Sequence, residues 1–312
     1  MMPSVFDFHA DDFALTAHSD QDITTLLESG TLDSISVMPN MSDFPRACGL
    51  IANGNGQFPY PKISVHLNFM EGKSLCAHSE VPHLTDEHGF FRISWGWLLL
   101  WNYNPFMRKN IRRELAAEIE RQARAVIDSG ILREQRLRFD SHQHPHMIPL
   151  VFDALCDAIR SLSAQGFDTE FIRNARDPLF PYFKSGTFFR GFSPANFVKC
   201  MILNFFAHRV SRKLRKMRLD DNCICGVFFS GNMDAVRLKK VLPAFARLVR
   251  HRDITAEILF HPGTVLDQEL GDEFTKAGFN EFHTSQRRKT EYEAATLVRG
   301  FARELTKDFY KE

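Results

Sequence analysis

Short β-rich runs alternate with helical patterns along the whole chain of 312 residues, and this alternation limits the folds open to it. We predict seven strands, at residues 5–9, 34–38, 63–67, 137–140, 167–172, 224–229 and 256–260. Between strands, apolar residues recur at helical spacing, as in Ile111, Leu115 and Ile119. Strands joined through helices pair in parallel with right-handed crossovers. The sequence therefore predicts an α/β fold, an irregular (β/α) TIM-like barrel with about seven mostly parallel strands.

The length is compatible with one large domain. Domains average ~150 residues, but α/β barrels commonly reach about 250 residues as one unit. We find no internal repeat, low-complexity tract or linker rich in Gly, Pro or Ser. We predict a single barrel domain over residues 1–312, with insertions at about 76–108 and 185–222.

Composition excludes several classes of protein. The 39 Lys and Arg residues balance 38 Asp and Glu residues, so a net charge of +1 argues against a dedicated nucleic-acid binder. No apolar run reaches ~18 residues, so no transmembrane span is expected. Residues 1–9 lack the basic and apolar regions of a signal peptide, and the six cysteines are scattered. We expect a cytoplasmic protein with reduced thiols.

Polar residues follow the predicted strands at the edge where active sites of α/β barrels assemble. Because parallel strands end at the same edge of the sheet, these side chains are expected to lie close together. The residues are Asp11, Asp12, His66, His142, Arg173 and His261.

Asp12, His66 and His142 form a candidate trio of metal ligands. Aspartate and histidine suit a divalent cation of borderline hardness, and a catalytic site leaves one position for water. Pro145 constrains residues 142–146, so at most one or two of the three histidines there can face one cation. The structural alternative is an acidic pair that caps a turn and a polar loop, with His144 and His146, at the barrel mouth.

Four sequence blocks contain these residues. They are Ala10-Asp11-Asp12-Phe13, Val65-His66-Leu67-Asn68 with Glu71-Gly72-Lys73, Asp140-Ser141-His142-Gln143-His144-Pro145-His146, and His261-Pro262-Gly263. In type and order they resemble the signature blocks of the YdjC-like carbohydrate deacetylase family, which includes the chitooligosaccharide deacetylases. The resemblance covers residue 5 to about residue 297.

The resemblance implies a hydrolase that uses one divalent metal ion, Mg or Zn, to remove the acetyl group from an N-acetylated amino sugar or a short N-acetylglucosamine oligosaccharide. It matches Asp12, His66 and His142 to the metal ligands. It matches Asp11 to the general base and His261 to the histidine that protonates the departing amine. It also implies a homodimer. Residues expected to bind substrate or to orient the others are Arg173, His144, His146 and Asn68.

The chemistry of an acetamide independently calls for these residue types. An acetamide is a poor electrophile, so a metal must polarise its carbonyl or acidify a water molecule. A carboxylate can take the proton of that water, and an acid must protonate the nitrogen before it leaves.

Two positions depart from the family pattern. The family usually has Asn where this chain has His9, and Gly where it has Ala14. A Cβ at residue 14 restricts the backbone, so the loop after Phe13 is expected to differ. His9 is expected to be a buried, hydrogen-bonded structural residue or to tune the neighbouring base.

Two other segments have more than one interpretation. Residues 199–218 contain seven basic side chains among apolar residues at helical spacing. They predict either a peripheral contact with anionic lipid, with a glycolipid as substrate, or a barrel helix with a solvated basic face. Residues 90–106, with Trp95, Trp97 and Trp101, predict either a wall that stacks on sugar rings or a dimer contact or core.

The expected function is thus metal-dependent N-deacetylation of a small carbohydrate. One alternative keeps the metal site but hydrolyses another bond, such as a phosphoester, and would release phosphate. A second alternative is a non-catalytic protein that binds a carbohydrate or a lipid surface on the same barrel. The departures at His9 and Ala14 keep that second alternative open, and metal content would distinguish it.

Overall fold

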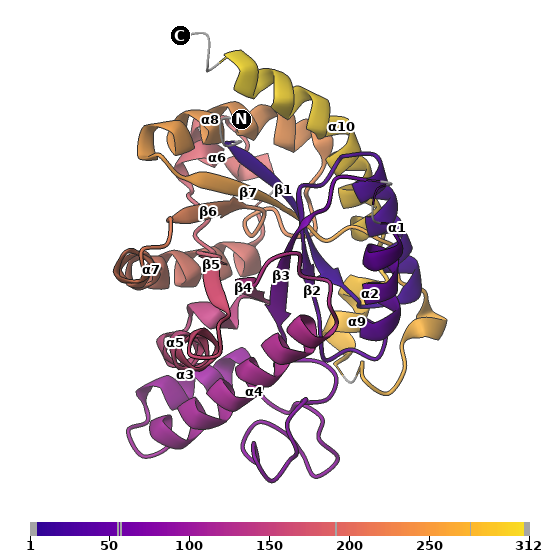
Figure 1. The fold of residues 1–312 in the computed structure, drawn as a ribbon. Coiled ribbons are helices and arrows are strands. Elements are labelled where there is room, and N and C mark those ends of the chain that lie inside the picture. Colours follow the sequence, from indigo (N-terminus) through magenta and orange to yellow (C-terminus); the bar gives the residue numbers. More distant parts are fainter. Residues whose placement is uncertain (1–4, 55, 57, 191, 275, 309–312) are drawn as a thin grey trace.

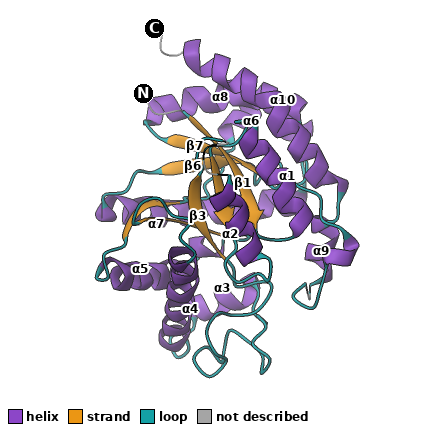
Figure 2. Ribbon diagram, turned by 45° about the vertical axis from the view of Figure 1, so that its right-hand side comes forward, coloured by secondary structure: helices purple, strands orange, loops and turns teal. Residues whose placement is uncertain are grey.

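The computed structural model describes residues 5–54, 56, 58–190, 192–274 and 276–308, and seven parallel strands form its central sheet (Figure 1). The strands are β1 (Phe6–Phe13), β2 (Ser34–Val37), β3 (Lys62–Leu67), β4 (Arg136–Ser141), β5 (Asp168–Ile172), β6 (Asn222–Cys225) and β7 (Thr255–Phe260). Their order is β5-β4-β3-β2-β1-β7-β6. The sheet curls into an incomplete barrel with helices outside it (Figure 2), which confirms the predicted α/β barrel-like fold.

The described residues form ten helices, most of which cover the outer side of the sheet (Figure 1). They are α1 (Ala17–Glu28), α2 (Phe44–Asn53), α3 (Trp95–Tyr103), α4 (Arg108–Asp128), α5 (Pro149–Ser163), α6 (Phe180–Lys184), α7 (Pro194–Met217), α8 (Ala235–Arg252), α9 (Ala277–His283) and α10 (Gln286–Asp308), with 3-10 turns η1 (Pro145–Met147), η2 (Phe188–Arg190) and η3 (Asp267–Glu269). Local sequence sets several of their ends. Thr16 and Ser19 form a capping box before α1, and Asp234 caps α8. The two segments predicted as insertions contain α3 and α7, while the single-domain organisation stays a prediction.

Two strands differ by several residues from those predicted, and the other five differ by at most one residue at either end. β1 continues to Phe13, so Asp11 and Asp12 belong to the strand, and Asp12 has a φ of 64° where the pairing with β2 shifts. β6 ends at Cys225, whereas the prediction continued to Phe229. Residues 226–229 are apolar and buried as a strand would be, but they form a turn under the cavity. The apolar pattern of the sequence alone did not distinguish a buried strand from a buried turn.

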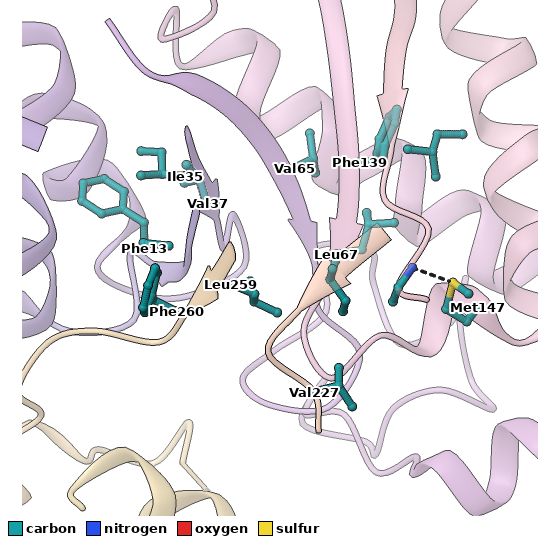
Figure 3. Close-up of a cluster of buried hydrophobic side chains, with 14 of the residues drawn as sticks. Phe13, Ile35, Val37, Val65, Leu67, Phe139, Met147, Val227, Leu259 and Phe260 are labelled. Carbon is teal, nitrogen blue, oxygen red and sulfur yellow. Dashed lines mark hydrogen bonds between the residues drawn. The ribbon is translucent and has the colours of Figure 1, made fainter. Parts of the chain in front are cut away.

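Side chains alternate along the strands between an apolar outer face and a polar inner face. Ser36 on β2 donates a hydrogen bond to Asp140 on β4, although these strands are not neighbours in the sheet. Such contacts place the polar side chains inside the barrel. The intervening residues of β2, β3 and β4 pack as a hydrophobic layer, part of which Figure 3 shows with Ile35, Val37, Val65, Leu67 and Phe139.

The Asn222 side chain and backbone groups link the two edge strands. The backbone N–H of Asn174, just after β5, donates to Oδ1 of Asn222 on β6 at 2.8 Å. The Asn222 amide donates in turn to the carbonyl of Ile172 at 3.0 Å, and the N–H of Ile224 donates to the carbonyl of Arg176 at 2.9 Å. These bonds bring β5 and β6 together without a regular ladder.

Asp177 is a buried carboxyl group that joins this link to the turn after β6. It accepts hydrogen bonds from the N–H of Phe228 at 2.8 Å and from the Tyr182 hydroxyl at 2.7 Å. Burial raises the pKa of Asp177 to about 7, although these hydrogen bonds act in the opposite direction. The folded protein therefore holds a proton here that the unfolded chain releases at lower pH.

Asp177→Asn tests this proton. Because a raised carboxyl pKa destabilises the folded state as pH rises, wild-type stability should fall relative to the variant between about pH 5 and about pH 8. The expected change in the difference between their free energies of unfolding is about 1–3 kcal/mol over that range. Urea denaturation at several pH values measures it. Parallel pH profiles for the two proteins would contradict the assignment.

Candidate active site

Five of the predicted site residues meet at the carboxyl ends of four strands. Asp11 and Asp12 lie near the end of β1, and His66 is the penultimate residue of β3. His142 follows β4, and its N–H donates to the carbonyl of Leu67 at 3.0 Å, which fixes it beside β3. His261 follows β7, which neighbours β1 in the sheet. Residues distant in sequence are thus brought together as expected.

Asp12, His66 and His142 each offer one ligand atom, and these atoms lie within 4.8 Å of one another. Oδ1 of Asp12 lies 2.9 Å from Nδ1 of His142 and 3.5 Å from Nε2 of His66. The other oxygen of Asp12 accepts a hydrogen bond from Arg288 at 3.0 Å. One Asp12 oxygen is therefore occupied, and the other faces both histidines.

A carboxylate lies behind each of the two histidines. Nδ1 of His66 hydrogen-bonds to Asp140 at 2.6 Å. Nε2 of His142 lies 3.0 Å from Glu71, whose same oxygen is 3.1 Å from Nε2 of His283. These carboxylates fix the ring orientations and leave Nε2 of His66 and Nδ1 of His142 on the Asp12 side, in the arrangement common behind metal-binding histidines.

The buried carboxylates make the site strongly attractive to positive charge. Burial lowers the pKa of His66, but Asp11 and Asp140 outweigh it and raise the pKa to about 10. For His142, Asp12 and Glu71 likewise outweigh burial and raise the pKa to about 9. Burial works against ionisation of Asp12, yet His142 holds its pKa well below the usual range.

Arg173 places a fixed positive charge beside Asp11. This arginine is fully buried and contacts Asp11 at 3.0 Å, Asp140 at 3.0 Å and Glu257 at 2.7 Å. Burial would raise the pKa of Asp11, but Arg173 and then His66 hold it well below its usual range. Arg173 thus keeps Asp11 ionised and in place, which is one of the two roles considered for it. Its guanidinium lies inside the barrel.

His9 contacts the other side of Asp11. Its Nε2 lies 3.1 Å from Asp11 and 2.6 Å from the Ser36 hydroxyl, while Nδ1 lies 2.6 Å from the Ser34 hydroxyl. The ring is completely buried. His9 is therefore a hydrogen-bonded structural histidine in direct contact with Asp11.

His261 lies across the site from His142. Its Nε2 is 3.9 Å from Asp11, and Nδ1 is 3.5 Å from Glu291, which also accepts a hydrogen bond from the His261 N–H at 2.6 Å. Its side chain is 18% exposed and borders the cavity. His261 can therefore contact a molecule bound in the cavity, and it also lies close to the buried Asp11.

The remaining predicted residues separate into two groups. His144 borders the cavity, in a left-handed conformation with a φ of 64°. His146 points away from it, because Nε2 bonds to the carbonyl of Arg173 at 2.8 Å and Nδ1 to the Ser141 hydroxyl at 2.5 Å. Asn68 holds the loop after β3, donating to the carbonyl of Glu71 at 2.9 Å. His146 and Asn68 thus support the site from outside the cavity.

Four residues at the site were not assigned a role from the sequence. Glu71 and Asp140 lay within the quoted motifs, but neither was given a role. His283 and Lys199 lay outside the motifs, and no sequence signal connected them to the site. Lys199 on α7 borders the cavity beside His144, and burial lowers the pKa of its ammonium group.

A cavity of about 220 Å³ opens directly onto these side chains. Its lining includes Asp12, His142, Gln143, His144, Lys199, Val227, Leu259, His261, Phe279, Phe282 and His283. One wall is polar and carries the ionisable groups, and the other is formed by phenylalanines of α9. Such a cavity suits a small molecule with both polar and apolar faces.

The chain is similar in sequence to known proteins. A family model described as YdjC-like protein matches residues 7–299. A carbohydrate deacetylase from Vibrio cholerae serotype O1 is 28% identical over 146 residues, which are 47% of this chain and 53% of the relative. A chitooligosaccharide deacetylase from Yersinia pestis is 26% identical over 162 residues, 52% of this chain and 58% of the relative. The chain thus spans about half the length of the curated relatives it matches.

A solved structure shows the same fold over almost the whole chain. It is described as a candidate cellobiose-phosphate cleavage protein from Enterococcus faecalis V583. The TM-score is 0.57 at 19% sequence identity, with 94% of this chain and 95% of that chain covered. This similarity concerns the fold alone.

Proposed function

Because the chain belongs to the YdjC-like protein family, we propose that it is a carbohydrate deacetylase, which removes the acetyl group from an N-acetylated amino sugar or a short N-acetylglucosamine oligosaccharide. The observation that carries this proposal is the convergence of Asp12, His66 and His142 beside a cavity that Asp12, His142 and His261 line, with Asp11 3.9 Å from His261. Amide hydrolysis requires a cation site, a base and an acid in one place.

The residues fit one divalent cation, which we propose to be Mg or Zn. Among the described residues, the buried Nε2 of His66 has no hydrogen-bond partner, although Asp12 lies 3.5 Å away. Asp12, His66 and His142 would hold the cation. Two histidines and one carboxylate suit several first-row metals as well as Mg. When bound, the cation would polarise the acetyl carbonyl and make water more acidic.

Asp11 and His261 supply the proton transfers in this proposal. Asp11 accepts a proton from the attacking water, whose oxygen forms a bond to the acetyl carbon. The bond between that carbon and the sugar nitrogen breaks, and His261 delivers a proton to the nitrogen. The products are acetate and a free amino sugar. Arg173 keeps Asp11 ionised for the first transfer.

Acetate release tests the proposal. Purified protein should release acetate from N-acetylglucosamine oligomers, stop after EDTA treatment, and recover when Mg, Zn or Co is added. Acetate release that EDTA does not affect would refute the metal site. Phosphate release from sugar phosphates without acetate release would favour the phosphoester alternative. Metal-free protein that hydrolyses neither substrate would favour a binding protein.

Glu71→Gln should weaken metal binding without removing a ligand. The neutral amide does not replace the carboxylate that contacts both His142 and His283, so His142 loses the partner that orients it. Loss of such a partner typically costs 10–100-fold in metal affinity, and we expect about that loss here. Titration calorimetry with Zn measures it.

Glu114→Gln is the matched control for Glu71→Gln. Glu114 is also a buried carboxylate paired with a histidine, His83 at 2.5 Å, but it lies on α4. This control should leave Zn affinity unchanged. Equal Zn affinities for the Glu71→Gln variant and wild type would contradict the role of Glu71.

A further inference from the structure

Large apolar side chains are exposed over one part of the surface. Of 13 such side chains among the described residues, 11 lie in residues 97–106 and 180–205. These segments contain α3, α6, η2 and the first half of α7. The most exposed are Phe106 at 88%, Phe189 at 83% and Phe205 at 73%. Clustered exposure of this kind marks an interaction surface rather than ordinary scatter.

The solvent-exposed face of α7 changes character along the helix. Val198, Met201 and Phe205 are exposed in its first half, at helical spacing. Arg212, Arg215 and Lys216 are exposed on the same face in its second half. A soluble helix normally directs a polar stripe to solvent. Here the exposed stripe is apolar and then cationic.

Ring contacts connect α6, η2 and the start of α7 to one another. Phe183 stacks on Phe188 with centroids 3.9 Å apart, and Phe188 contacts Phe192 at 5.8 Å. Phe192 contacts Phe197 of α7 at 5.6 Å. We call the exposed side chains of residues 97–106 and 180–205, with Arg212, Arg215 and Lys216, the α3–α7 face.

The α3–α7 face continues to the active-site cavity. A second cavity of about 250 Å³ lies between α3 and α7, lined by Trp95, Val198 and Ile202. Gln143 and Lys199 line this cavity and the active-site cavity alike. The apolar surface therefore begins at the mouth of the site.

We propose that the α3–α7 face docks on the surface of an anionic lipid bilayer. Apolar side chains enter the interface while arginine and lysine contact lipid phosphates, as in other peripheral proteins. Among the described residues, no ion pair joins Arg212, Arg215 or Lys216 to a carboxylate, so their charge is available. Within the described part of the chain, no helix is both long and apolar enough to span a bilayer.

A second copy of the chain fits this face less well than a lipid surface. Cores of protein interfaces are depleted in charge, and a symmetric dimer through α7 would either bring the two basic clusters together or bury each against apolar side chains of the other copy. The chain as a whole has a net charge of only +1, so the cationic character is local. An anionic bilayer neutralises it and accepts the phenylalanines.

Docking in this way orients the cavity mouth toward the bilayer. If the proposed deacetylation holds, the N-acetylated sugar that the protein deacetylates is then attached to a lipid. The docking itself does not depend on catalysis, so it is measured without any substrate.

Vesicle co-sedimentation tests the docking. The full chain should pellet with vesicles of phosphatidylcholine and phosphatidylglycerol in equal parts and stay in solution with phosphatidylcholine alone. Replacing Arg212, Arg215 and Lys216 by serine should reduce binding on the order of 100-fold. Each of the three basic residues contributes a similar share of the binding free energy near an anionic surface. Phe205→Ser should also reduce binding.

Matched controls come from exposed residues outside the face. Val236→Ser and Leu297→Ser remove apolar side chains of comparable exposure, and serine at Lys239, Lys240 and Arg247 removes the same charge from α8. These variants should bind vesicles as the wild type does. Equal sedimentation with neutral and anionic vesicles would overturn the proposal. So would a dimer in light scattering that Phe205→Ser dissociates, if vesicles bind neither form.

Discussion

Asp11→Asn is expected to lower kcat for acetate release by about 10²–10⁴-fold, the usual contribution of a general base. The amide cannot take a proton from water, yet it fills the same space between Arg173 and His9. Because Asp11 is not among the three ligands that we assign to the cation, metal content should stay near that of wild type. Acetate assays and metal analysis of the same preparation measure both effects.

Asp12→Asn provides the comparison for the neighbouring position. It removes the carboxylate that faces both His66 and His142, so metal content and activity should fall together. Full activity in the Asp11→Asn variant would show that another group takes the proton. Loss of metal in that variant would show that Asp11 is itself a ligand.

The sequence was sufficient to predict that the polar residues after several strands meet at one edge of a parallel sheet. Alternating strands and helices require parallel pairing, and parallel pairing brings the ends of β1, β3, β4 and β7 to one edge. The hydrogen bond of 2.9 Å between Asp12 and His142 joins residues 130 positions apart. Polar residues at the ends of buried strands were a reliable signal of the site. Buried polar groups are rarely without a hydrogen-bond partner, so such residues are expected to contact one another.

The polar interior of the barrel was less accessible from the sequence. Ser34-Ile35-Ser36-Val37 shows the alternation, but alternation alone does not say whether the polar face meets solvent or the barrel interior. Only the contact from Ser36 across to Asp140 resolves the direction. His283 reaches Glu71 from α9, and no pattern in the sequence connects these two residues.

The backbone conformation at Ala14 is not the one expected for a residue with a Cβ. A Cβ was expected to change the loop after Phe13, yet Ala14 has a φ of 76°, in the region that glycine prefers. The Ala14 N–H donates to the buried Asp20 carboxylate at 2.7 Å, and the side chain is fully buried. Tertiary contacts thus hold a conformation that costs an alanine about 1–2 kcal/mol.

Arg173→Met is expected to destabilise the protein by about 3–5 kcal/mol, the usual effect of removing one partner from a buried ion pair. The guanidinium is the central cation for Asp11, Asp140 and Glu257, and all four groups are buried. Methionine occupies similar space, so the loss reports on uncompensated carboxylates rather than on a cavity. Urea denaturation measures the free energy of unfolding.

Two further variants separate charge compensation from other causes. Arg176→Met, three positions away, removes a partly exposed arginine that lies 3.6 Å from Asp221, and should change stability by less than about 1 kcal/mol. Adding Glu257→Gln to Arg173→Met removes one of the uncompensated charges. If those charges cause the instability, the double variant must be more stable than Arg173→Met alone. An additive or larger loss would mean that Arg173 stabilises the barrel through its packing instead, and that Asp11 does not depend on it for its charge.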